Sequence, residues 1–167
     1  FPGGREQISE KADAILLLSL ISGRNPDYLI GEHIRAAKQL KKSKLEIIPT
    51  GYVLVSGGKK YSAQKVSRTT PINYSDTERA ASTAIAGELL GMKLIFLEAG
   101  SGAGRPLSRE MVQRVKRNIY CPLIVGGGID SAEKAMILCQ AGADVVVVGN
   151  GIEKDSTLVK KIAEAIK

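Results

Sequence analysis

Short, largely apolar runs alternate along the chain with longer stretches of mixed polarity. The runs have the length of buried strands, and several are rich in β-branched residues. The glycine, proline and polar residues that bound them are typical of turns. The pattern predicts five strands, at residues 14–21, 45–55, 94–97, 122–125 and 145–148.

The stretches between these runs carry apolar residues at helical spacing. The first of them carries apolar residues at the helical spacing that a core-facing surface requires, at Leu29, Ile30, Ile34, Ala37 and Leu40. Good N-cap residues begin four of the predicted helices, with Pro26 at the first helical position of one: Asn25, Asp76, Ser108 and Ser131. Glycines follow two of the helices, Gly91 and Gly142, where helix ends favour them.

Successive strands joined by helices must pair in parallel. A doubly wound open sheet satisfies the same string of elements, but no G-x-G-x-x-G follows any predicted strand. Polar or glycine-rich turns follow several strands in succession, which favours a barrel. Residues 1–4 and the stretch 7–11 resemble the tail of a sixth unit. We expect one α/β domain over residues 1–167, an incomplete (β/α)8 barrel of TIM-barrel type that holds about six βα units and lacks the first two.

Composition narrows the class of protein. With 167 residues, 44% hydrophobic and 25% charged, the chain is long enough for a single core. It shows no apolar run of membrane-spanning length and no leader pattern, so we expect a cytoplasmic location. Cys121 and Cys139 lack metal-ligand spacing, and we interpret both as small buried residues.

The net charge of +7 raises the question of nucleic acid. The basic residues are spread over several helices, and aromatic residues make up only 4% of the chain, which leaves no stacking platform for bases. We therefore expect no nucleic-acid partner and interpret the charge as solvated helix surface, with some attraction for anionic substrates or lipid surfaces.

Glycine-rich turns follow the last two predicted strands. Gly126, Gly127 and Gly128 follow one, and Gly149, Asn150 and Gly151 follow the other. Because glycine has no Cβ, an anion can approach the backbone N–H groups of these turns closely. The helix that follows each turn adds the positive end of its dipole. Two such turns at the end of the chain predict a phosphate site like that of many (β/α)8 barrels. The alternative is that these glycines only permit tight turns.

A carboxylate ends the strand at 94–97. Glu98 is followed by Ala99, Gly100, Ser101 and Gly102, and a carboxylate at that place is costly unless it meets a polar ligand or partner. It could accept hydrogen bonds from substrate hydroxyls, or it could pair with a core Arg or Lys.

Three further residues have weaker cases. Tyr52 could line an apolar pocket or pack in the core, and Arg24 could contact an anion or form a surface ion pair. His33, the single histidine, has no nucleophile or second ligand at a suitable spacing, and we interpret it as structural.

Four segments in this order resemble the geranylgeranylglyceryl phosphate synthase family over the whole chain: residues 48–52 (IPTGY), 97–103 (LEAGSGA), 125–129 (VGGGI) and 148–150 (VGN). The LEAGSGA run is the most distinctive. The resemblance implies a prenyltransferase that joins sn-glycerol 1-phosphate to a long-chain prenyl diphosphate, with Mg2+, in the synthesis of ether-linked phospholipids. It further implies a homo-oligomer and peripheral contact with a membrane.

The resemblance also implies the site. Glu98 would be the catalytic residue and hold the glycerol hydroxyls, while Tyr52 would be a candidate for lining the prenyl pocket. The other residues implied to bind glycerol phosphate are Phe96, Leu97, Ala99, Gly100, Ser101, Gly102, Gly127, Gly128, Gly149 and Asn150.

Two departures from the family pattern matter. Phe96 stands where the family usually has Tyr, so one hydroxyl contact is lost. The metal ligands of the family lie in the two units that we expect to be missing. We therefore expect the chain as it stands to bind glycerol phosphate without completing catalysis.

Two alternatives stay open. One is another phosphate-binding barrel, an isomerase or aldolase acting on a sugar phosphate, which would need a general base or a Schiff-base Lys at a strand end. The other is a fragment that only binds the phosphate substrate.

Overall fold

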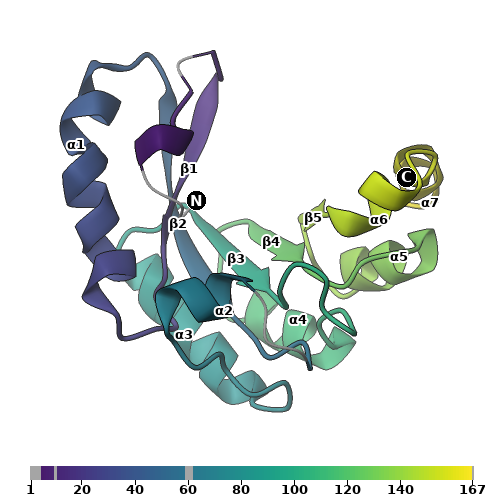
Figure 1. Cartoon of the computed structure of the whole chain (residues 1–167). Coiled ribbons are helices and arrows are strands. Elements are labelled where there is room, and N and C mark those ends of the chain that lie inside the picture. Colours follow the sequence, from purple (N-terminus) through teal and green to yellow (C-terminus); the bar gives the residue numbers. More distant parts are fainter. Residues whose placement is uncertain (1–4, 10, 59–61, 167) are drawn as a thin grey trace.

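The computed structural model describes residues 5–9, 11–58 and 62–166, and it is built on one parallel sheet of five strands in the order β1-β2-β3-β4-β5 (Figure 1). The strands are β1 (Ala14–Ser19), β2 (Glu46–Leu54), β3 (Leu94–Glu98), β4 (Leu123–Gly126) and β5 (Val145–Val147).

Each strand pairs in parallel with the strand that follows it in sequence. A doubly wound sheet reverses this order at its switch point, whereas a barrel does not. The order therefore confirms the prediction of a barrel-type fold over the five strands, and the sheet forms an open part of such a barrel. The predicted tail of a sixth unit begins at residues 1–4, which lie outside the described residues.

Helices connect the strands and cover mainly the convex side of the sheet (Figure 1). They are η1 (Arg5–Gln7), η2 (Asp27–Gly31), α1 (Glu32–Lys42), α2 (Ser62–Ser67), α3 (Thr77–Leu89), α4 (Arg109–Lys116), α5 (Ala132–Gln140), α6 (Asn150–Lys154) and α7 (Leu158–Ala165). The sequence pattern missed α2, a helix of only six residues between β2 and α3. The helical stretch expected at 7–11 is reduced to the 3-10 turn η1.

Side-chain caps begin three of the helices as predicted. Asp76 accepts a hydrogen bond from the Arg79 N–H (3.1 Å), Ser108 from Met111 (3.1 Å) and Ser131 from Lys134 (3.2 Å). Each satisfies one N–H that a helix leaves unpaired at its start. Local sequence thus sets where α3, α4 and α5 begin.

The two faces of the sheet pack differently. On the convex face, Ile95 and Leu97 of β3 lie in a large apolar core with the helices, which includes Met111 and Val115. The alternate residue Phe96 points to the concave face and joins a second apolar cluster with Tyr52. Glu98 has the same parity as Phe96, so its carboxylate lies on the concave side at the carboxyl end of β3.

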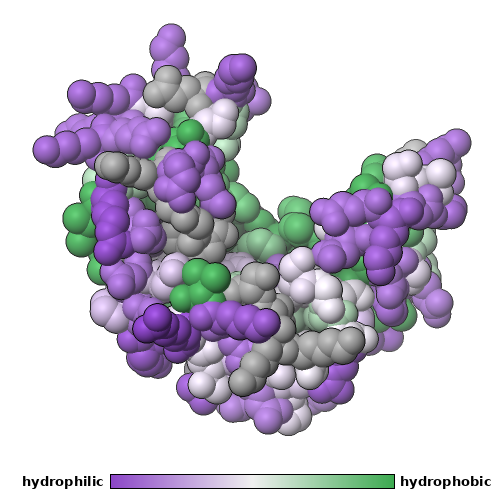
Figure 2. Space-filling view, viewed as in Figure 1, coloured by the Kyte–Doolittle hydropathy of each residue, from purple (hydrophilic) through white to green (hydrophobic). Residues whose placement is uncertain are grey.

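The concave face is hollowed, and apolar residues line the hollow between the two ends of the molecule (Figure 2). At one edge, Val145 and Val147 of β5 are each more than 40% exposed. The cysteines are partly buried, so the interpretation of both as small buried residues holds only in part. Burial is the main cause that raises the pKa of Cys121, to about 11, with Glu88 as a further contributor.

Leu97 and Leu89 form a matched pair for testing this core. Leu97 is completely buried, whereas Leu89 is 82% exposed. We expect Leu97→Ala to lower the free energy of unfolding by about 2–5 kcal/mol, because it leaves a cavity beneath the helices. Leu89→Ala should change it by less than about 0.5 kcal/mol. Urea unfolding followed by circular dichroism measures both, and equal losses would contradict this description of the core.

Candidate functional site

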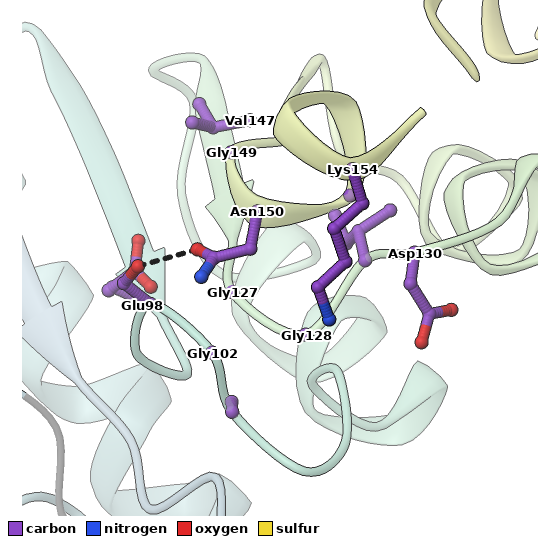
Figure 3. A pocket seen from close by; sticks show the side chains of 13 residues that line it. Glu98, Gly102, Gly127, Gly128, Asp130, Val147, Gly149, Asn150 and Lys154 are labelled. Atoms are coloured by element: carbon purple, nitrogen blue, oxygen red, sulfur yellow. Dashed lines mark hydrogen bonds between the residues drawn. The ribbon is translucent and has the colours of Figure 1, made fainter. Parts of the chain in front are cut away.

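The loops that follow β3, β4 and β5 meet around one pocket with a volume of about 270 Å³ (Figure 3). From the first loop it is lined by Glu98, Ser101, Gly102 and Ala103, and from the second by Gly127, Gly128, Ile129 and Asp130. The third side comes from Val147, Gly149, Asn150, Gly151 and Lys154. The site is therefore assembled at the carboxyl ends of three neighbouring strands, where barrels place their chemistry.

Glu98 is the buried acid of this pocket. Its side chain is 9% exposed, and its Oε1 accepts a hydrogen bond of 2.7 Å from the Gly100 N–H. Burial raises the pKa of this carboxyl, and the Gly100 hydrogen bond opposes the rise. No Lys or Arg within the described residues forms an ion pair with it. The alternative of a structural ion pair for Glu98 is thus not what the structure shows.

Gly126 makes room for this carboxylate. A Cβ on Gly126 would lie 2.7 Å from Glu98 Oε2 and 2.9 Å from the Phe96 ring. Contacts that short are repulsive, so any larger residue at the end of β4 would displace the acid or the ring.

Gly127 and Gly128 let two loops touch through their backbones. Their φ angles are +88° and +70°, a region that favours glycine. A Cβ on Gly127 would lie 2.6 Å from the Gly100 nitrogen, and one on Gly128 would lie 2.5 Å from the Arg105 carbonyl carbon. The glycines therefore serve the turn and its packing, as the alternative interpretation held, and they also line the pocket with bare backbone.

The third loop is connected to the first by one hydrogen bond. Ser101 Oγ donates to Asn150 Oδ1 at 2.8 Å, across 49 residues of sequence (Figure 3). This bond leaves the amide nitrogen of Asn150 available as a donor. Gly149 precedes the first turn of α6, so the loop brings backbone N–H groups to the pocket.

Two charged residues of the pocket were missed by sequence reasoning. Lys154 extends from α6 toward Gly128, and Asp130 lies beyond it (Figure 3). Asp130 forms an ion pair of 2.7 Å with Lys134. Lys154 stands four residues after Asn150 on a helix, a spacing that puts both on one face and could have indicated it.

Five residues implied by the resemblance do not line this pocket. Leu97 and Ala99 lie in the convex-face core, and the Gly100 N–H is bonded to Glu98. Phe96 and Tyr52 meet edge to face, with ring centroids 5.2 Å apart, in the concave-face cluster. Their roles in binding substrate stay predictions.

A neighbouring cavity of about 380 Å³ lies along β1 and α1, and Leu16, Leu18 and Phe96 are among its mostly apolar lining residues. Phe96 therefore borders a second, apolar space on the side of the sheet away from β5.

The described residues form neither a metal-binding cluster nor a helix suited to cross a membrane. Over residues 5–9, 11–58 and 62–166, no group of three or more His, Cys, Asp or Glu side chains is placed to hold a metal ion. The expectation of Mg2+ remains a prediction. Within those ranges, no helix has both the length and the apolar character needed to cross a membrane.

Comparison with known proteins gives a consistent result. The sequence profile of the PcrB family matches residues 1–166. A geranylgeranylglyceryl phosphate synthase of Chitinophaga pinensis is 52% identical over 166 residues, covering 99% of this chain and 66% of that protein. One of Saccharolobus solfataricus is 44% identical, covering 100% of this chain and 65% of that protein. The chain thus spans about two thirds of the length of these curated relatives.

A solved structure is similar as well. The (S)-3-O-geranylgeranylglyceryl phosphate synthase of Thermoplasma acidophilum, in complex with its substrate sn-glycerol-1-phosphate, superimposes with a TM-score of 0.92 at 37% identity. The match covers 100% of this chain and 68% of that chain.

The burial of Glu98 predicts a pH-dependent stability. Its pKa is raised on folding, so the neutral acid is tolerated at low pH and stability is lost as pH rises through the folded-state pKa. We expect Glu98→Gln to unfold at a higher temperature than the parent protein, with a gap that widens from about pH 4 to pH 7. Thermal unfolding at several pH values measures this, and Glu110→Gln, at an exposed position on α4, is the control. A gap that is constant with pH would contradict it.

Gly128 and Gly149 allow a steric test of the loops. We expect Gly128→Ala to lower the unfolding temperature by several degrees, because the new Cβ meets the Arg105 backbone at a positive φ. A Cβ on Gly149 would meet nothing within 4 Å, so Gly149→Ala should unfold near the temperature of the parent protein. Thermal unfolding of both variants checks the difference. Equal shifts would argue against a close contact between the loops.

Proposed function

The chain belongs to the PcrB family, and from that membership we propose that it carries the glycerol phosphate site of a prenyltransferase acting on sn-glycerol 1-phosphate and a long-chain prenyl diphosphate. The observation that carries the proposal is the meeting of three glycine-rich loops and one buried acid in a single pocket. The curated relatives bear the name of this synthase, and the T. acidophilum neighbour was solved with glycerol 1-phosphate.

The phosphate group would lie against the loops after β4 and β5. Backbone N–H groups at Gly127, Gly128, Gly149 and Asn150 surround that part of the pocket, and the Lys154 ammonium reaches the same space. Backbone donors bind a phosphate dianion without a large charge of their own. Lys154 adds a single positive charge on a flexible stem.

The glycerol hydroxyls would lie against Glu98. Glu98 lines the pocket at the end of β3, where its Oε1 accepts a hydrogen bond from the Gly100 N–H and its Oε2 lies beside Gly126. Oε2 would accept a hydrogen bond from a glycerol hydroxyl. A raised pKa makes this group a better proton acceptor near neutral pH.

The reaction needs few groups from the protein. The terminal hydroxyl oxygen of glycerol phosphate forms a bond to C1 of the prenyl chain, and the bond from C1 to the diphosphate oxygen breaks with its electron pair. Glu98 takes the hydroxyl proton. Holding the hydroxyl oxygen close to C1 of the prenyl chain would supply most of the remaining rate enhancement. The Mg2+ that the family resemblance implies would neutralise the diphosphate in the whole protein.

The apolar cavity beside Phe96 is the best candidate for the start of the prenyl tail, because it adjoins the concave face and is mostly apolar. Tyr52 would then act through Phe96, against which it packs. A homo-oligomer, peripheral contact with a membrane and a cytoplasmic location remain proposals for the whole protein.

A sugar-phosphate isomerase or aldolase fits less well. The five described strands end in Ser19, Leu54, Glu98, Gly126 and Val147, so none of these ends supplies the Lys that Schiff-base chemistry needs. Glu98 could still be the base of an isomerase, and the assay below separates the two reactions.

The proposal is tested by binding and by turnover. We expect calorimetry to show binding of sn-glycerol 1-phosphate, weakened about three- to tenfold in Lys154→Gln because one charge-assisted contact is lost. Lys160→Gln, on the exposed side of α7, is the matched control and should bind like the parent protein. For turnover, the whole protein is incubated with sn-glycerol 1-phosphate and geranylgeranyl diphosphate, and the ether product and diphosphate are quantified. Turnover of a sugar phosphate without prenyl transfer would refute the assignment.

A further inference from the structure

A second polar pocket lies at the carboxyl ends of the strands, around the loop that follows β1. It has a volume of about 470 Å³ and shares no residue with the glycerol phosphate pocket. Its lining includes Ser22 and Arg24 from the loop after β1, Arg68, Thr69 and Thr70 from the segment after α2, and Arg79 from the first turn of α3.

Three arginines line this pocket, Arg24, Arg68 and Arg79, and none of its lining residues among those described is acidic. Among the described residues, no carboxylate forms an ion pair with Arg24, Arg68 or Arg79. Arg24 Nη1 instead donates to the carbonyl oxygens of Gly23 (2.7 Å) and Ile21 (3.4 Å). The pocket therefore carries a formal charge of about +3 that the protein itself does not neutralise.

The acidic residues nearest in sequence are engaged elsewhere. Asp27 forms an ion pair of 2.9 Å with Arg35, and Glu78 forms an ion pair with Arg114. Asp76 caps α3 through the Arg79 N–H, at 3.1 Å. Each of these carboxylates has a local role, which leaves the guanidinium groups for an external anion.

Hydrogen bonds between partly buried groups hold the two loops of the pocket together. Asn25 Nδ2 donates to the Ser67 carbonyl oxygen at 2.8 Å, and the hydroxyls of Ser67 and Thr69 are 2.7 Å apart. Ser22 Oγ accepts from the Leu54 N–H at 2.9 Å, which anchors the first loop to the end of β2. Ser22 and Ser67 are both buried. The arginines thus project from a connected frame.

The backbone at Arg68 is unusual. Its φ angle is +52°, and within the described residues it is the single non-glycine residue with a positive φ. Such a conformation is costly for a long side chain and is found where the surroundings require it. Asn or Gly would adopt it more easily, so the arginine side chain, rather than the turn, accounts for the residue at this position.

We propose that this pocket is a second anion site, which binds the phosphate group of a ligand other than glycerol phosphate. Guanidinium groups match phosphate oxygens in a paired geometry, and three of them suit a group with two to three negative charges. The Thr70 hydroxyl, at the same rim, supplies a neutral donor. Soluble pyrophosphate and the headgroup of an anionic lipid both present this chemistry.

The test uses the purified protein and two variants that remove a charge without disturbing the frame. Arg68→Asn keeps a residue that accepts the positive φ, and Arg79→Gln keeps the first turn of α3. We expect each to weaken binding of pyrophosphate about tenfold in calorimetry, the usual effect of losing one charge-assisted hydrogen bond. Arg109→Gln, an exposed arginine on α4, is the control and should bind like the parent protein.

A second arm identifies the source of the phosphate group. Co-sedimentation is measured with phosphatidylcholine vesicles that contain about 30 mol% phosphatidic acid and with vesicles of pure phosphatidylcholine. Loss of vesicle binding in the two variants, with little affinity for pyrophosphate, assigns a lipid headgroup, and the reverse assigns a soluble anion. Both results support the site.

Two outcomes would overturn it. One is no binding of either probe by the parent protein. The other is binding that Arg68→Asn and Arg79→Gln leave unchanged, which would place the anion elsewhere. Lys154→Gln separates this inference from the proposed function, because it should weaken glycerol 1-phosphate binding without affecting the arginine pocket.

Discussion

Close backbone contact between the loops after β3 and β4 is the constraint on which the site depends. Gly127 and Gly128 lie so near Gly100 and Arg105 that no side chain fits between them. This contact brings the carboxyl ends of two strands into one surface made largely of main chain. The third loop then joins through Ser101 and Asn150. The pocket is thus formed mainly by the packing of loop backbones, and its charged side chains lie at a surface that this packing has already shaped.

The pocket holds one buried carboxylate, Glu98, whose charge no ion pair among the described residues offsets. Among the described residues, buried Glu98 accepts from the Gly100 N–H and forms no ion pair, whereas Asp130 pairs with Lys134. Burial of an unpaired carboxylate opposes folding at neutral pH and raises its pKa. The same environment favours a bound hydroxyl as hydrogen-bond donor, and under the proposed function the raised pKa would make Glu98 a better acceptor for the hydroxyl proton. Burial of Glu98 therefore lowers the stability of the fold at neutral pH, while the raised pKa would favour the proposed proton transfer.

The two polar pockets at the strand ends, which we propose as anion sites, are built from different groups. One uses glycines, a helix start and a single lysine around a buried acid. The other uses three arginines beside partly buried hydroxyl and amide groups that are hydrogen-bonded to one another or to the backbone. The first excludes large charges of its own and suits a ligand that must also present hydroxyls to Glu98. The second has no acid to position a hydroxyl and suits a group recognised by charge alone.

The order of the elements and the core of the site could be predicted from sequence, because both depend on short-range rules. Apolar runs of strand length, caps at Asp76, Ser108 and Ser131, and glycines after β4 and β5 are local signals. The tertiary structure decided which members of the LEAGSGA run face the pocket, since alternation along β3 sends Leu97 and Ala99 to the convex core. It also decided that Lys154 lines the first pocket and that Arg24, Arg68 and Arg79 line the second, because these groupings join residues far apart in sequence and depend on strand register and helix orientation.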